Sequence, residues 1–141
     1  MIRLRAMLLA ASLFGFVPSN IAWADIAVIV GKGSDVKQLS RSEVINIFMG
    51  RYRKLPNGLT ALPVDLSPSK ARFYRALVNQ DLAEINSYWA RLFFSGQTSP
   101  PQQAASLAEV QDIIEHNQGA VTYVDKGHVT ENMRIVLELD E

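Results

Sequence analysis

The chain has 141 residues, no cysteine, and 14 basic residues against 14 acidic ones, so its formal charge is zero. A balanced charge gives no reason to expect a nucleic acid or an anionic membrane surface as a partner. The absence of cysteine excludes disulfides and thiol chemistry, so the apolar core alone must hold the fold together.

Residues 1–24 have the features of a cleavable secretory signal peptide. Arg3 and Arg5 precede an apolar run that is too short to cross a bilayer as a helix, and Ala22–Ala24 ends in the small-x-small pattern of a cleavage site. The alternatives are an uncleaved membrane anchor and an ordinary buried helix. Cleavage would leave residues 25–141 as one domain, periplasmic or secreted. Its formal charge would be −2, because the leader takes two of the 14 basic residues and none of the acidic ones.

The first part of this domain predicts two strands with a helix between them. Residues 26–30 form a continuous apolar, β-branched run, as in a strand that is buried on both faces. Ser40 and Glu43 fit a capping box, which predicts that a helix begins there. A second strand is expected at 60–66, after an Asn-Gly turn.

Three further helices are expected before the chain returns to the sheet. Ser67 is predicted to cap the first helix, with a proline in its first turn, and either Asn79 or Asp81 to cap the second. Loop 96–105 follows, and a capping box at Ser106 begins the third. Apolar residues at three- and four-residue steps predict that one stripe of the second helix faces the core. The stripe consists of Leu82, Ile85, Tyr88, Trp89, Leu92 and Phe93.

Strands at 120–124 and 134–139 complete the chain. Strands that alternate with helices predict a single layered α/β domain with a mainly parallel sheet. No second apolar run approaches the length of a membrane span, so the mature chain is expected to be soluble.

The turn from Asp65 to Arg72 is where the sequence best supports ligand binding. It joins the end of a strand to the start of a helix, and ligands of parallel α/β sheets bind beyond the carboxyl ends of the strands. A helix N-terminus offers unpaired N–H groups to an anion. Ser67 and Ser69 add hydroxyl groups, and Lys70 adds positive charge as Arg72 does. A plain helix cap beside a solvated basic surface is the alternative.

The sequence offers little for catalysis. His116 and His128 do not lie at metal-ligand spacing from each other or from a carboxylate cluster. There is no nucleophile–base motif and no glycine pattern for nucleotide phosphates. We therefore expect neither an enzyme nor a cofactor.

Segments along most of the mature chain resemble, in order, the phosphate-binding proteins of ABC-type phosphate transporters. They are Ile26–Val30, "LSRSEVINIFMG" at 39–50, "ALPVDL" at 61–66, "FY" at 73–74, "YW" at 88–89 and "HNQGAVTYVD" at 116–125. Members of that family are two-lobed and more than twice as long. The resemblance therefore implies one lobe of a type II periplasmic-binding protein.

In that family the turn typically reads Arg-x-Asp-Gly-Ser-Gly-Thr, and its Ser, Gly and Thr hold the oxyanion. Asp65, Ser67 and Ser69 fall on the motif's Asp, Ser and Thr. Pro63 stands at the Arg position, so that bidentate partner is missing, and Pro68 replaces a glycine N–H donor. The resemblance implies oxyanion contacts from Asp65, Ser67 and Ser69, and Lys70 or Arg72 would replace the missing Arg.

The function implied by the resemblance is that of a periplasmic substrate-binding-like protein for phosphate or a similar oxyanion. In ABC-type phosphate uptake its partner would be a transporter permease. The alternative is an accessory or sensory module of an envelope protein that keeps the fold and has lost tight ligand binding. Its contact surfaces would be the basic segment Arg51–Lys54 and the loop Gln97–Gln103.

Overall fold

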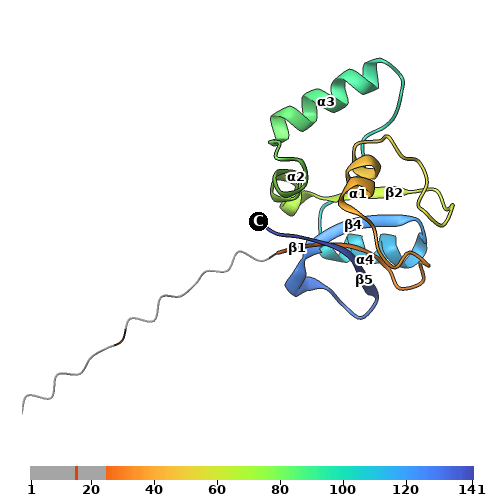
Figure 1. The fold of residues 1–141 in the computed structure, drawn as a ribbon, viewed down its shortest axis with the longest axis vertical. Coiled ribbons are helices and arrows are strands. Elements are labelled where there is room, and N and C mark those ends of the chain that lie inside the picture. The colour runs from red at the N-terminus through yellow and green to blue at the C-terminus, as the bar shows by residue number, and fades with distance from the viewer. Residues whose placement is uncertain (1–14, 16–24) are drawn as a thin grey trace, which may run out of the picture.

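The computed structural model describes Gly15 and residues 25–141, so the predicted leader lies, apart from Gly15, outside the described residues. Within this described part, no helix is both long and apolar enough to span a bilayer. Figure 1 shows α3 outermost on one side, with α1 and α2 between it and the sheet. The elements, in chain order, are β1 (Ile26–Gly31), α1 (Arg41–Phe48), β2 (Leu62–Leu66), the 3-10 helix η1 (Ser67–Ser69), α2 (Lys70–Val78), α3 (Leu82–Phe94), β3 (Gln102–Ala104), α4 (Leu107–His116), β4 (Ala120–Asp125), the 3-10 helix η2 (Lys126–His128) and β5 (Met133–Leu139).

The five strands form one sheet in the order β3-β2-β4-β1-β5. β2 runs parallel to β3 and β4, whereas β1 runs antiparallel to β4 and β5. The predicted single α/β domain is confirmed, and its sheet is mixed. The first and last strands are neighbours, with Ile26 opposite Leu139.

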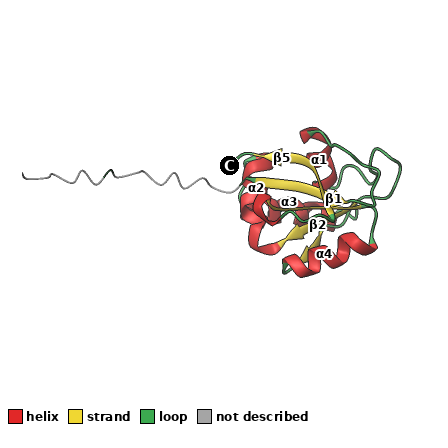
Figure 2. Cartoon of the chain, turned by 90° about the horizontal axis from the view of Figure 1, so that it is seen from below, coloured by secondary structure: helices red, strands yellow, loops and turns green. Residues whose placement is uncertain are grey.

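Helices cover both faces of this sheet, with α4 on one side and α1 on the other (Figure 2). β1 is buried along its whole length, as its unbroken apolar run predicts. On one face, Phe73 of α2 stacks on Tyr123 of β4 with ring centroids 3.7 Å apart. Phe48 of α1 meets Phe73 edge to face at 4.8 Å. These fully buried rings join two helices to the centre of the sheet.

The helix starts follow the predicted caps in three of the four cases. Ser40 and Glu43 form the reciprocal capping box at α1, and the Asp81 carboxylate accepts the Glu84 N–H at 2.8 Å. Ser106 caps α4, although the Glu109 carboxylate accepts from the N–H of Ala105 at 2.8 Å. These local signals are sufficient because both partners lie within four residues of each other.

Loop 96–105 contains a strand that the sequence did not predict. β3 is three residues long, and its Gln102 and Gln103 are exposed. It pairs in parallel with β2 at the edge of the sheet. A short polar edge strand has neither alternation nor β-branched residues, so its backbone pairing leaves no pattern in the sequence.

The predicted core stripe of α3 is correct at its centre and wrong at its end. Ile85 and Trp89 are buried, whereas Phe93 is 65% exposed. Toward its C-terminal end, α3 slants away from α1 and from the sheet (Figure 1). The period of three to four residues gives the direction that a side chain faces, but not whether anything lies there.

Candidate functional site

The strand-to-helix turn begins where the buried end of β2 leaves the sheet at Leu66. A 3-10 turn, Ser67–Ser69, follows, and α2 begins only at Lys70. The prediction that Ser67 caps this helix is therefore wrong. Ser69 is the residue before α2, and its side chain makes no capping hydrogen bond. Ser67 is exposed and Ser69 is buried.

Asp65 is a buried carboxylate that other side chains of the domain surround. It is 1% exposed. Its Oδ1 accepts the hydroxyl of Tyr74 at 2.9 Å and that of Tyr123 at 3.0 Å. Its Oδ2 accepts Nε2 of Gln103 at 3.1 Å and lies 3.7 Å from Nζ of Lys70. These contacts compensate the carboxylate for the water that it loses on folding.

Lys70 lies over this network. Besides its contact with Asp65, its Nζ lies 3.4 Å from Oε1 of Gln103. The ammonium group is therefore directed toward β2 and β3, close to the turn. Asp65 and Lys70, two of the residues that the sequence singled out, therefore lie together at the end of β2.

Arg72 faces a different set of partners. Its Nε and Nη2 donate to the two carboxylate oxygens of Glu141, each at 2.7 Å, and its Nη1 donates to Oδ1 of Asp125 at 2.7 Å. The hydrogen bond to Glu141, and then that to Asp125, raise the pKa of Arg72 above its ordinary value. This guanidinium ties α2 to the ends of β4 and β5. An anion at the turn would compete with both carboxylates for it.

Sequence reasoning missed Tyr74, Tyr123 and Gln103 as partners of Asp65. Tyr74 falls in a predicted helix, and Tyr123 falls in the strand predicted at 120–124. A signal was present, because two tyrosines on core-facing positions need acceptors for their hydroxyl groups. A carboxylate at the end of a buried strand is a suitable acceptor.

The two buried tyrosines make the free energy of unfolding depend on pH in the alkaline range. Burial, and then the charge of Asp65, raise the pKa of both Tyr74 and Tyr123 far above the ordinary value. In the unfolded chain both phenols ionise near pH 10, whereas in the folded chain they keep their protons. Below about pH 10 they are neutral in both states, so their effect is confined to higher pH.

We therefore expect the free energy of unfolding to fall above about pH 10, by about 1.4 kcal/mol per pH unit for each tyrosine. Urea denaturation between pH 8 and 11 measures this slope. The Tyr74→Phe variant should have a slope that is shallower by the contribution of one tyrosine. An identical slope in the variant would contradict the assignment.

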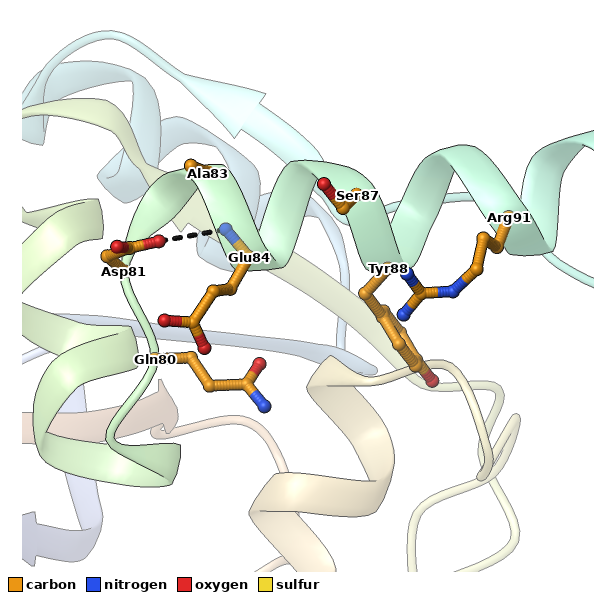
Figure 3. A pocket seen from close by; sticks show the side chains of 7 residues that line it. All are labelled: Gln80, Asp81, Ala83, Glu84, Ser87, Tyr88 and Arg91. Carbon is orange, nitrogen blue, oxygen red and sulfur yellow. Dashed lines mark hydrogen bonds between the residues drawn. The ribbon is translucent and has the colours of Figure 1, made fainter.

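A separate groove of about 410 Å³ lies along α3 (Figure 3). Glu84 and Gln80 lie at one end of it, and Tyr88 and Arg91 lie together further along the helix. The Tyr88 hydroxyl donates to the carbonyl of Met49 at 2.6 Å, which fixes α3 to the end of α1. Over the described residues, no three His, Asp or Glu side chains lie close enough together to hold a metal ion. The groove thus presents side chains of both charges.

No family model matches the sequence, and no curated protein matches it either. Among solved structures, the chain is similar to an ABC-type phosphate transport receptor from Vibrio cholerae, with 14% identity and a TM-score of 0.60 over 80% of this chain and 45% of that one. It is also similar to a putative phosphate ABC transporter substrate-binding protein with bound phosphate from Clostridium perfringens, with 18% identity and a TM-score of 0.62 over 82% of this chain and 45% of that one. The chain spans less than half the length of either protein. Its fold matches one lobe of such a substrate-binding protein.

Proposed function

We propose that this chain is an exported, single-lobe binding protein that recognises an oxyanion, with phosphate as the first candidate, at the Ser67–Arg72 turn. The observation that carries the proposal is the likeness of its fold to two proteins of phosphate transport, one of which holds phosphate. The leader-like sequence of residues 1–24 supports export to the periplasm. In a transport role the partner would be an ABC transporter permease.

The groups available to an anion at this turn are few. The Ser67 hydroxyl is exposed, and the Lys70 ammonium lies beside the turn, within 3.7 Å of Asp65. Arg72 is already held by two carboxylates. A desolvated phosphate needs several donors at once, so a single lobe should bind it weakly unless a second surface covers the site.

Calorimetric titration with phosphate is expected to show a dissociation constant on the order of 1 mM, which corresponds to a binding free energy of about 4 kcal/mol in magnitude. The Ser67→Ala/Ser69→Ala variant should bind at least several-fold more weakly. Ser42→Ala, on the exposed surface of α1, is the matched control and should bind as the parent does. Sulfate and a carboxylate, titrated in parallel, give the selectivity.

Two results would contradict oxyanion binding at the turn. One is the absence of any response at tens of millimolar phosphate. The other is a response that the Ser67→Ala/Ser69→Ala variant leaves unchanged, since that anion would bind elsewhere.

A second candidate is an accessory or sensory module of an envelope protein. Two features favour it: Asp65 is fully engaged by Tyr74, Tyr123 and Gln103, and Arg72 is engaged by the carboxylates of Asp125 and Glu141. Such a module would show no phosphate response and would act through a protein contact. The same titration therefore separates the two candidates.

A further inference from the structure

Several large apolar side chains are exposed on two segments of the domain. Phe93 and Phe94, at the end of α3, are 65% and 88% exposed. Tyr52 and Leu59, in the segment between α1 and β2, are 50% and 38% exposed. Exposed apolar side chains that gather on one surface are typical of binding surfaces.

The two segments that carry these side chains touch. Nη2 of Arg53 donates to the carbonyl oxygen of Gln97 at 2.8 Å. Phe93, Arg53 and Thr60 line a common groove of about 520 Å³ together with residues 96–99. Phe94 lies beside Phe93, with ring centroids 6.2 Å apart. Arg53 and Thr60 of the first segment thus border one groove with Phe93 and residues 96–99 of the second.

This surface is basic, although the chain as a whole is neutral. Residues 44–64 and 85–108 contain no aspartate or glutamate. The basic residues in these two stretches are Arg51, Arg53, Lys54 and Arg91. We call Phe93 and Phe94, with Arg51, Arg53 and Lys54, the aromatic–basic face.

We propose that the aromatic–basic face docks a protein partner that presents apolar side chains flanked by acidic residues. Aromatic and arginine side chains are the residues that contribute most to binding energy at protein interfaces. Phe93 and Phe94 would supply the apolar contact, and the groove beside Arg53 would receive a carboxylate. Opposite charge on the partner would speed association and select it from others.

The charge argues against a second copy of this chain as the occupant. A symmetric dimer would bring the face against itself and so place Arg51 and Lys54 near their own copies without a carboxylate from either segment. A lipid surface would leave the groove at Arg53 and Thr60 unfilled. A protein segment with both acidic and apolar side chains can pack on the aromatic rings and pair with the basic groups at the same time.

This face does not depend on the proposed oxyanion site. Thr60 precedes β2, whereas Ser67 follows it, so the two surfaces lie at opposite ends of the same strand. A protein without phosphate affinity could still use the aromatic–basic face, and the reverse also holds. The two proposals can therefore fail separately.

The test is an NMR titration of the full chain with synthetic peptides in which glutamate alternates with leucine and phenylalanine. Shifts are expected at the amides of residues 51–60 and 91–99, and the affinity should fall as salt is added. A matched peptide with lysine in place of glutamate should not bind. Equal binding of the lysine peptide, or shifts confined to other residues, would overturn the proposal.

Variants on exposed positions isolate the two components of the face. Phe93→Ser/Phe94→Ser and Arg51→Glu/Lys54→Glu should each weaken peptide binding about tenfold or more. The control, Lys32→Glu/Lys37→Glu, makes the same change of charge at other exposed positions and should bind normally. Thermal unfolding of the variants checks that the fold is retained. Unchanged affinity in both face variants would refute the assignment.

Two further arms test the other occupants. The full chain is sedimented with vesicles of phosphatidylglycerol, and its oligomeric state is measured by analytical ultracentrifugation. The proposal is supported if the chain is a monomer and does not sediment with the vesicles. Vesicle binding, or a dimer, that is lost in Phe93→Ser/Phe94→Ser would assign the face to lipid or to a second copy instead.

Discussion

Replacing Asp65 by alanine is expected to lower the free energy of unfolding by about 3–5 kcal/mol. The substitution leaves the hydroxyl groups of Tyr74 and Tyr123 buried without their acceptor, and it leaves Lys70 without the carboxylate beside it. Each orphaned buried donor costs about 1–3 kcal/mol. Urea denaturation followed by circular dichroism measures the loss.

Two further variants show that the loss comes from unpaired polar groups. Asp65→Asn keeps an oxygen that can accept the tyrosine hydroxyls, so it should be milder than Asp65→Ala. Replacing both tyrosines by phenylalanine in an Asp65→Leu chain removes donors and acceptor together, and should recover part of the stability. If Asp65→Ala cost less than about 1 kcal/mol, the network would have no structural role.

Among substitutions of glycine by alanine, Gly119→Ala should destabilise the fold most. We expect it to lower the free energy of unfolding by about 3 kcal/mol. A Cβ at this position would lie 2.0 Å from the carbonyl oxygen of Thr60. Because that oxygen belongs to the backbone, it cannot move away by a change of rotamer as a side chain can. The Gly119 carbonyl also accepts the Leu62 N–H at 2.9 Å. Relief of the clash would therefore separate β2 from β4 at the point where their pairing begins.

Gly127→Ala is the matched control, because a Cβ there has no heavy atom within 4 Å. Its effect should be within about 0.5 kcal/mol. Thermal unfolding of the two alanine variants gives the comparison. Equal melting temperatures would show that the approach of Thr60 to Gly119 does not determine the pairing of these strands.

Local features of the fold could be read from the sequence, and distant contacts could not. The strand at 26–30 and the caps at Ser40 and Asp81 depend on residues within a few positions of each other. The partners of Asp65 do not: Tyr123 is 58 positions away and Gln103 is 38 positions away. Gln103 reaches it from β3, an edge strand whose polar sequence gives no strand signal.

The candidate site shows the same limit. The sequence places Asp65, Ser69 and Lys70 in one turn, because they are consecutive or nearly so. It does not show that Arg72 is directed toward Glu141, at the far end of the chain. The exposure of Phe93 could not be predicted from the sequence either, because helical periodicity does not show where the neighbouring elements end.

The pairing of β1 with β5 has a consequence for how such a domain can be combined with others. Ile26 lies opposite Leu139, so the polypeptide enters and leaves the domain at one point on its surface. A domain with adjacent ends can be inserted into a loop of another protein, or removed from one, without breaking its own sheet.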